Sequence, residues 1–299
     1  MKQQSFKSIS LKGALLLLLS AMAFALSTVF AKVVTTGSPV PGIEVTFVRF
    51  SVGLVFAGLY LYYRKIPIRP HNPRLVILRA VTNTAAVLFF FTGIQFTTVT
   101  NANMLNMTYP VFVFLIAPYF NREANRKKNY IFLFLTIIGV YLIVVPDFQS
   151  INPGDVSALM SGICAGMAIS ALREARKYDN SFVILFYLMF IGIFINAGIM
   201  IPLFVMPDLY IFIFMMLSAI TAVAGQVLIT VGYRFIDAAP GSLISASRIL
   251  FAGILGFSIF GDPLTFRILS GGILILIALT GVSGIVRFLR TSSLPGSSQ

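Results

Sequence analysis

The stretch "FTGIQFTTVTNAN", residues 91–103, has a related copy in the other half of the chain, "TVGYRFIDAAPGS" at residues 230–242. The two stretches align at an offset of 139 residues, which places Gly93 opposite Gly232. Both stretches lie at the junction between one apolar segment and the next. A pattern that recurs at such a junction predicts that the chain contains two copies of one fold unit.

Two further matches follow in the same order along the chain. Glu123 of "YFNRE" aligns with Asp262 of "IFGDPLT" at the same offset of 139, and "GVYLIVV" at Gly139 aligns with "GVSGIV" at Gly281 at an offset of 142. The common order and the nearly constant spacing predict a duplication of five helices plus five helices. The predicted domains are residues 1–147, residues 148–290 and a flexible C-terminal tail over residues 291–299.

The composition indicates a polytopic membrane protein. Of the 299 residues 58% are hydrophobic and 10% are charged, with a mean hydropathy of +0.94, which is more apolar surface than a soluble domain buries. The net charge of +13 does not indicate nucleic-acid binding, because the basic residues lie in short clusters between apolar segments. With one cysteine, Cys164, and one histidine, His71, we expect no intramolecular disulfide, no metal site and no cofactor.

The N-terminal apolar run, "GALLLLLSAMAFALSTVFAKV", admits two interpretations. Its "AMAFA" segment resembles a signal-peptidase site, and Lys2, Lys7 and Lys12 precede the run. A signal peptide, however, has an apolar region of about 7–15 residues, and this run is longer. We therefore interpret it as the first membrane-spanning helix.

The apolar segments predict ten membrane-spanning helices, since a helix needs about 20 apolar residues to cross roughly 30 Å of hydrocarbon. The predicted spans are 13–34, 44–63, 76–96, 102–120, 130–146, 155–173, 182–205, 210–233, 241–260 and 267–288. Short loops join them, so any binding site is expected within the helical bundle.

The basic residues predict how these spans are oriented. With the N-terminus inside, eighteen basic residues fall on inner segments and two, Lys32 and Arg267, on outer ones. The inner residues are Lys2, Lys7, Lys12, Arg64, Lys65, Arg69, Arg74, Arg79, Arg122, Arg126, Lys127, Lys128, Arg173, Arg176, Lys177, Arg234, Arg287 and Arg290. By the positive-inside rule we expect a multi-pass protein of the inner (plasma) membrane with both termini in the cytoplasm.

Five spans per unit is an odd number, so the second unit crosses the membrane in the opposite direction to the first. Inverted repeats of this kind are typical of secondary transporters, which bind substrate near the membrane midplane between the repeats. Exchange of conformations between two similar halves would provide alternating access.

The sequence resembles the drug/metabolite transporter superfamily, in its EamA-type branch. The resemblance covers residues 13–288 and rests on four stretches: "EVTFVRF", "MTYPVFVFLIAPYFNRE", "GDVSALMSGICAG" and "ASRILFAGILGFSIFGDPLT". Ile249 stands where the family pattern has a proline in the second half. The resemblance implies a ten-helix carrier of small metabolites. It suggests amino acids and their derivatives, including S-adenosylmethionine-like compounds, as substrates.

Polar residues inside the predicted spans are the candidates for substrate binding. Asn103, Asn106 and Pro110 lie on one face of a continuous helix, and their repeat partners include Ser242 and Ser245. We expect amides to offer donors and acceptors to a substrate in a central cavity, with Pro110 kinking the helix to open it. The alternative is that these side chains only form hydrogen bonds between packed helices. The full candidate set is Arg49, Asn83, Asn103, Asn106, Tyr109, Pro110, Gln226, Ser242, Ser245 and Arg248.

Arg49 and Arg248 are the two arginines placed within predicted spans. An arginine at the centre of a membrane helix costs about 2.5–3.5 kcal/mol on insertion scales, so neither is expected to face lipid unpaired. Arg49 follows Glu44 by five residues and could pair with it or extend outward to the membrane surface. The functional alternative for both is a guanidinium that binds a substrate carboxylate.

No Asp or Glu lies deep within a predicted span, which favours a facilitator or exchanger over a proton antiporter. No phosphate-binding loop is present in the sequence, so we expect no use of ATP by this chain. The expected partners are a small-molecule substrate and the lipid bilayer, without nucleic acid, in a monomer or dimer. Two other functions remain open: a non-transporting scaffold or receptor-like protein, and a membrane-embedded transferase.

Overall fold

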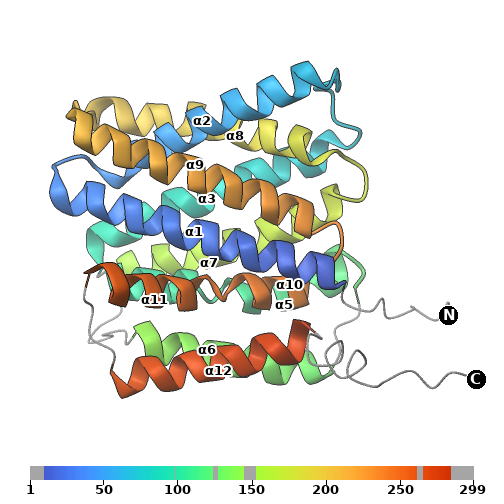
Figure 1. Cartoon of the computed structure of the whole chain (residues 1–299). Coiled ribbons are helices and arrows are strands. Elements are labelled where there is room, and N and C mark those ends of the chain that lie inside the picture. The colour runs from blue at the N-terminus through green and yellow to red at the C-terminus, as the bar shows by residue number, and fades with distance from the viewer. Residues whose placement is uncertain (1–9, 98, 124–126, 145–152, 261–264, 284–299) are drawn as a thin grey trace, which may run out of the picture.

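The computed structural model describes residues 10–97, 99–123, 127–144, 153–260 and 265–283, and these residues are helical apart from their connections (Figure 1). The helices are α1 (Leu11–Gly37), α2 (Gly42–Tyr63), α3 (Pro73–Phe96), α4 (Val99–Asn106), α5 (Tyr109–Phe120), α6 (Lys127–Val144), α7 (Pro153–Ala175), α8 (Ser181–Met200), the short 3₁₀ turn η1 (Ile201–Leu203), α9 (Leu209–Gly232), α10 (Ala238–Ser245), α11 (Arg248–Phe260) and α12 (Phe266–Ser283).

These helices make ten crossings, because α4 with α5 and α10 with α11 each form one crossing. The all-α fold with ten helices is therefore confirmed. Among the described residues, seven of the crossings are long and apolar enough to span a membrane by length and composition, with α10 and α11 taken together. Helix α1 begins and α12 ends at the same end of the bundle (Figure 1).

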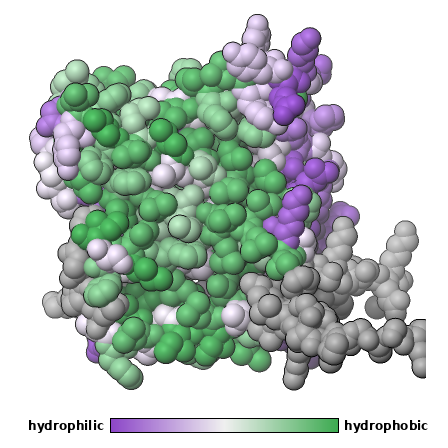
Figure 2. All heavy atoms as spheres, in the orientation of Figure 1, coloured by the Kyte–Doolittle hydropathy of each residue, from purple (hydrophilic) through white to green (hydrophobic). Residues whose placement is uncertain are grey.

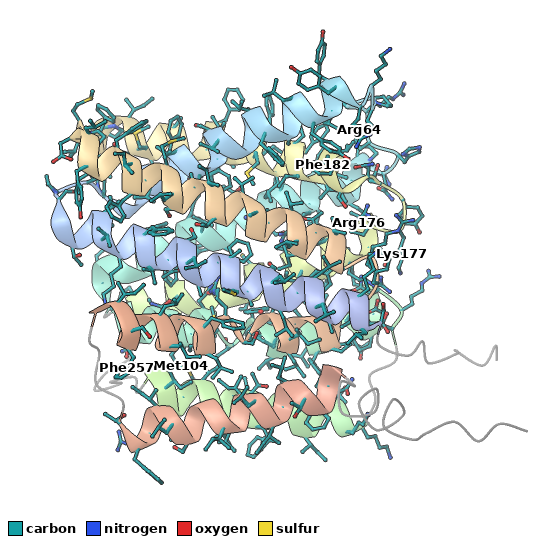
Figure 3. All side chains as sticks on the ribbon, viewed as in Figure 1. Arg64, Met104, Arg176, Lys177, Phe182 and Phe257 are labelled. Carbon is teal, nitrogen blue, oxygen red and sulfur yellow. The ribbon has the colours of Figure 1, made fainter. Side chains whose placement is uncertain are left out.

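The outer surface of the bundle fits a bilayer. Apolar side chains cover its middle, and strongly hydrophilic ones gather at one end (Figure 2). We call this the basic end; Arg64, Arg176 and Lys177 are labelled there in Figure 3. At this end the α3 and α8 helices begin at asparagine caps: Asn72 accepts a hydrogen bond from the Leu75 amide and Asn180 from the Phe182 amide.

The two halves are related by matching contacts. Helix α1 packs on α9, and α7 packs on α3 in the corresponding way. In the first pair the Ser20 hydroxyl donates to the Gly225 carbonyl at 2.7 Å, and in the second the Ser161 hydroxyl donates to the Ala86 carbonyl at 2.7 Å. Gly225 and Ala86 are separated by 139 residues (225 − 86), the same offset that the sequence shows. The contacts are thus consistent with inverted repeats.

Continuous helices over 102–120 and 241–260 were expected, and the structure shows that this is wrong. The first breaks between Asn106 and Tyr109, and the second breaks between Ser245 and Arg248. These breaks fall at corresponding positions of the two halves, near the middle of each crossing. Proline explains the first, since Pro110 occupies the first turn of α5, where it cannot continue the helix backwards. No proline is present at the second.

Both breaks place a hydroxyl residue at the same repeat position. The Thr108 hydroxyl donates to the Leu105 carbonyl at 2.6 Å, and the Ser247 hydroxyl donates to the Ile244 carbonyl at 2.7 Å. The Leu105 carbonyl also accepts from the Thr108 amide at 3.2 Å and the Ile244 carbonyl from the Ser247 amide at 3.1 Å, so each hydroxyl adds a second hydrogen bond to a carbonyl in the last turn before the break.

The halves approach closely where α6 meets α12. A Cβ atom added to Gly139 would lie 2.7 Å from the Gly271 carbonyl oxygen and 2.6 Å from the Ile275 Cγ1. A Cβ added to Gly271 would lie 2.6 Å from the Gly139 carbonyl oxygen. Only glycine at both positions lets the two backbones touch.

We expect Gly139→Ala to destabilise the protein by about 1–3 kcal/mol, because the new methyl group overlaps backbone that cannot move aside. The matched control is Gly253→Ala in α11, where an added Cβ meets no atom within 4 Å. Thermal unfolding of the two variants in detergent measures the difference. Equal melting temperatures would show that α6 and α12 do not pack in this way.

Candidate functional site

Three arginines and two tyrosines from five segments come together inside the bundle. They are Arg49 of α2, Arg79 of α3, Tyr109 of α5, Tyr233 directly after α9, and Arg248 of α11. Arg79, Tyr109 and Tyr233 are buried, while Arg49 and Arg248 keep part of their surface accessible. We call these five residues the arginine–tyrosine ring.

Electrostatic neighbours close the ring. Arg49 interacts with Arg248 and with Arg79, and both interactions are repulsions between like charges. Arg248 interacts with Tyr109, Tyr109 with Tyr233, and Tyr233 with Arg79. The five residues therefore follow one another in the order Arg79, Arg49, Arg248, Tyr109 and Tyr233, and Tyr233 is again next to Arg79.

Within the described part of the chain, no carboxylate interacts with any of the three arginines. Glu44, the expected partner of Arg49, is buried and accepts a hydrogen bond from the Val205 amide at 3.1 Å. The predicted pairing of Arg49 with Glu44 and its extension to the membrane surface are therefore wrong. The reason is that Arg49 is directed into the bundle, where Arg248 is its neighbour.

Arg79 was counted with the basic residues of an inner segment, and this placement is also wrong. It is 2% exposed and lies almost two turns inside α3, which begins at Pro73. The boundary of the predicted span at residue 76 left Arg79 in the first turn, where it looked like a flanking charge. The helix-start signal of Asn72 followed by Pro73 was the available indication that the helix begins earlier.

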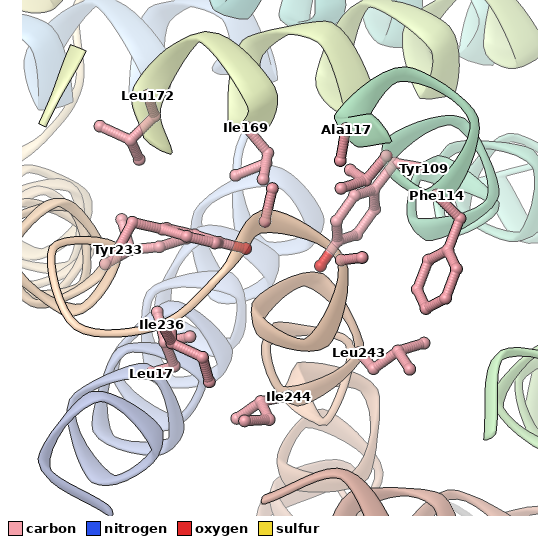
Figure 4. Packing of buried hydrophobic residues seen from close by; sticks show 14 of the residues in the cluster. Leu17, Tyr109, Phe114, Ala117, Ile169, Leu172, Tyr233, Ile236, Leu243 and Ile244 are labelled. Atoms are coloured by element: carbon pink, nitrogen blue, oxygen red, sulfur yellow. The ribbon is translucent and has the colours of Figure 1, made fainter. Parts of the chain in front are cut away.

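The two tyrosines join the halves at the centre of the bundle. Figure 4 shows their hydroxyl groups directed toward each other. The Tyr109 hydroxyl donates to the Ser242 carbonyl of α10 at 3.1 Å. The Tyr233 hydroxyl lies beside that of Ser245, although neither forms a hydrogen bond of standard geometry. Ser242 uses its own hydroxyl within α10, where it donates to the Ala239 carbonyl.

The asparagines lie on the α4 side of the centre. Asn106 donates from Nδ2 to the Ser161 hydroxyl at 2.6 Å, which continues the link from α4 through α7 to α3. Asn103 is half-buried on α4. Because the helix breaks after Asn106, the continuous face expected for Asn103, Asn106 and Pro110 does not form; Pro110 is buried in α5.

Two candidates come from neighbouring helices. Asn83 is half-buried and lies four residues after Arg79, so it shares a face of α3 with that arginine. Gln226 of α9 is buried, and its Nε2 amide has no hydrogen-bond partner. The role of all these residues in substrate binding stays a prediction.

Between the ring and the basic end lies a layer of packed apolar side chains. Ala117, Ile169, Leu172, Leu17 and Ile236 belong to the same buried cluster as the two tyrosines (Figure 4). Leu17, Ala117, Leu172 and Ile236 lie close to the ends of α1, α5, α7 and α9 that face the basic end. They come from both halves of the chain. This layer, the apolar plug, closes the bundle below the ring.

An ion network lies beyond the plug. Arg173 at the end of α7 forms an ion pair with Glu123 through Nε at 2.7 Å and with Asp237 through Nη2 at 2.7 Å. Its Nη1 also donates to the Tyr233 carbonyl at 2.9 Å. Glu123 accepts a further hydrogen bond from the Ala238 amide at 2.7 Å. Glu123 is thereby tied to the start of α10, so the network fastens one half to the other.

The pKa of the Glu123 carboxyl group is shifted by its position in this network. Burial raises the pKa of its carboxyl group, and the nearby charge of Asp237 raises it further. The guanidinium of Arg173 and the Ala238 amide act in the opposite direction, and the net shift is upward. The carboxyl is therefore easier to protonate here than it would be in water.

The opposite end is arranged differently. Helices α5 and α10 pack on each other toward the basic end, and no comparable contact joins α4 and α11 among the described residues. Helix α4 packs on α7 and α11 packs on α1, as α5 and α10 respectively also do. Met104 of α4 and Phe257 of α11 lie toward this opposite end in Figure 3. The parts of the two broken crossings that meet are therefore those near the plug.

Comparison with known proteins agrees with this arrangement. The model of the EamA-like transporter family matches residues 11–145 and 152–284. One solved crystal structure is similar with a TM-score of 0.78 at 14% identity, covering 92% of this chain and 98% of the other chain, which shows the fold alone.

Several named proteins are related at low identity. The pseudopaline exporter CntI of Pseudomonas aeruginosa is 23% identical over 91% of this chain and 95% of its own length. Solute carrier family 35 member G1 of Mus musculus is 25% identical over 94% of this chain and 80% of its own length. An S-adenosylmethionine uptake transporter of Rickettsia bellii is 22% identical over 57% of this chain and 58% of its own length. With both of its halves matched by the family model, the chain belongs to the EamA-like transporter family.

Proposed function

We propose that this chain is a secondary transporter that moves a small polar metabolite across the inner membrane by alternating access. The observation that carries the proposal is the position of the ring. It lies beside both helix breaks, between a basic end closed by the plug and the ion network and an opposite end where α4 and α11 pack on different helices. Breaks near the membrane midplane are where carriers of inverted-repeat architecture bind their substrates.

The side chains at the centre favour a substrate that bears a carboxylate. Arg49 and Arg248 keep part of their surface accessible, and guanidinium groups bind carboxylates through two parallel hydrogen bonds. An amino-acid derivative fits this requirement. The positive charge of a sulfonium, as in S-adenosylmethionine-like compounds, fits the arginines less well. The relatives are named for export and for uptake, so their names give no direction for this chain.

The charge distribution supports an orientation with both ends of the chain in the cytoplasm. Hydrophilic residues gather at the end where α1 begins and α12 ends (Figure 2), and Arg64, Arg176 and Lys177 are among them (Figure 3). The positive-inside rule assigns a basic end to the cytoplasm. In this orientation the described state is closed toward the cytoplasm, and transport requires the ion network to open.

The proposal is tested by counterflow in proteoliposomes. We expect labelled amino acids or their derivatives to accumulate faster when unlabelled substrate is preloaded, since a carrier exchanges one molecule for another. Liposomes without protein provide the baseline. If no member of a panel of amino acids, their carboxylated derivatives, succinate, glycerol 3-phosphate and nucleosides exchanges above that baseline, a non-transporting membrane protein becomes the better explanation.

The ion network gives a second prediction, in which the opening of the basic end is measured by the labelling rate of an introduced cysteine. In a Cys164→Ser background, we expect Ala117→Cys in the plug to react slowly with a water-soluble maleimide applied to the basic end. Arg173→Gln removes both ion pairs of the network and should accelerate labelling at least several-fold. Arg234→Gln is the control, because its exposed side chain takes no part in the ion pairs. Equal rates in both variants would rule out the network as the closure.

The pH dependence of this labelling follows from Glu123. Its neighbours are Arg173, Asp237, Tyr233 and the Ala238 amide. Because its pKa is raised in the closed state relative to water, the closed state binds the proton more tightly. Closure is therefore strengthened as the pH falls through the raised pKa and weakened as the pH rises above it. Because the thiolate is the reactive form, rates are compared with those of the same cysteine in the Arg173→Gln protein at each pH. We expect this relative labelling of Ala117→Cys to increase with pH, and Glu123→Gln to remove the increase. Labelling that increases toward acid pH would contradict the assignment.

A further inference from the structure

The charges around the ring do not balance. Arg49, Arg79 and Arg248 bring three guanidinium groups together, and no described carboxylate interacts with them. Among the described residues, the buried Nε atoms of Arg49 and Arg79 have no hydrogen-bond partner. The buried hydroxyls of Tyr233 and Ser245 lie beside each other without a hydrogen bond of standard geometry. The one recorded hydrogen bond from the Arg248 guanidinium goes to the Met107 sulfur at 3.8 Å, which is a weak acceptor.

Such an arrangement is unfavourable as long as it is empty. Ionisable residues inside a membrane are ordinarily paired with each other or with backbone carbonyls, and like charges repel strongly where water is scarce. Unsatisfied donors and uncompensated charges that persist in a packed interior mark places where a ligand completes the structure.

We propose that the arginine–tyrosine ring binds a small organic dianion, whose two oxyanion groups, carboxylate or phosphate, are held by the guanidinium groups of Arg49, Arg79 and Arg248. This inference rests on the proposed transport function and names its substrate class. The hydroxyls of Tyr233 and Ser245 supply further donors to the same anion.

The geometry favours two negative charges over one. A single carboxylate is held by one guanidinium at a time in the bidentate arrangement, which leaves two positive charges uncompensated. The three arginines come from three helices, α2, α3 and α11, so a ligand with separated anionic groups reaches more of them than a compact monoanion does. A zwitterion adds an ammonium group for which the described surroundings of the arginines provide no carboxylate.

The test uses ligands of matched size and different charge. Thermal unfolding of the purified full chain is followed with butyrate, 4-aminobutyrate, succinate and 1,4-diaminobutane, which share a four-carbon skeleton, and with glycerol 3-phosphate as the phosphate source. We expect succinate, glycerol 3-phosphate or both to stabilise the protein with an apparent affinity roughly tenfold or more above that of butyrate and 4-aminobutyrate. Which of the two binds separates carboxylate from phosphate. No stabilisation by either dianion, or an equal effect of 4-aminobutyrate, would overturn the proposal.

Variants show whether the arginines carry the binding. Arg49→Gln and Arg248→Gln are each expected to weaken the bound dianion roughly tenfold or more, while the empty protein melts at the same or a higher temperature because a repulsion is removed. Arg49→Lys, which keeps the charge, should retain more affinity than Arg49→Gln. Arg74→Gln, at an exposed position of α3, is the control and should change neither quantity. A lower melting temperature of the empty protein with unchanged dianion affinity would assign the arginines a structural role and reject the inference.

The outcomes separate this inference from the transport proposal. Dianions that bind in the wild-type protein without counterflow would support the ligand class and contradict transport. Counterflow of 4-aminobutyrate without dianion binding would support transport and contradict the ligand class. If the glutamine variants fail to fold, the comparison of the differently charged ligands on the wild-type protein still tests the ligand class.

Discussion

The backbone of a membrane protein has no water to satisfy its polar groups in the hydrocarbon region, and this requirement shapes the centre of this bundle. Two of its crossings are nevertheless interrupted near their middle. At each interruption the backbone forms a tighter turn, with the Thr108 amide donating to Leu105 and the Ser247 amide to Ile244, and the two hydroxyls donate to the same carbonyls. The Tyr109 hydroxyl adds a hydrogen bond to the Ser242 carbonyl from the other half of the chain. The irregular backbone at the two breaks is thus held by short turns and by side-chain hydrogen bonds to the same carbonyls.

Three kinds of contact follow one another from this centre to the basic end: polar, then apolar, then ionic. The tyrosines meet first, the apolar plug follows, and Arg173 with its two carboxylates closes the end. The plug depends on surface removed from water, whereas an ion pair depends on geometry and on protonation. A change of pH therefore acts on the outermost layer while the apolar contacts keep their strength.

Much of this organisation follows from the sequence, and the exceptions have physical causes. The repeat, the ten crossings and the asymmetry of basic residues could be predicted from the sequence. Each depends on composition or spacing over many residues, so a single atypical residue does not change the prediction. Pro110 predicted a kink in its helix. No proline precedes Arg248, so the second break could be predicted only from its position in the repeat, which corresponds to that of the first break. Arg79 was missed because an arginine near a helix start looks the same whether it turns toward the membrane surface or into the bundle. The neighbours of Arg49 come from distant segments, so no local pattern identifies them.

The contact between Gly139 and Gly271 has a mechanical consequence. One residue belongs to each half, and the backbones touch without side chains between them. Side chains can change rotamer and let helices slide, but two backbones in contact leave no such freedom. Gly154 of α7 meets the backbone of Gly93 and Thr97 at the end of α3 in the same way, so the halves touch backbone to backbone at two places, α6–α12 and α3–α7. Sliding of one half past the other is hindered at both contacts, which leaves more freedom for movement to helices outside them, such as α2 and α8.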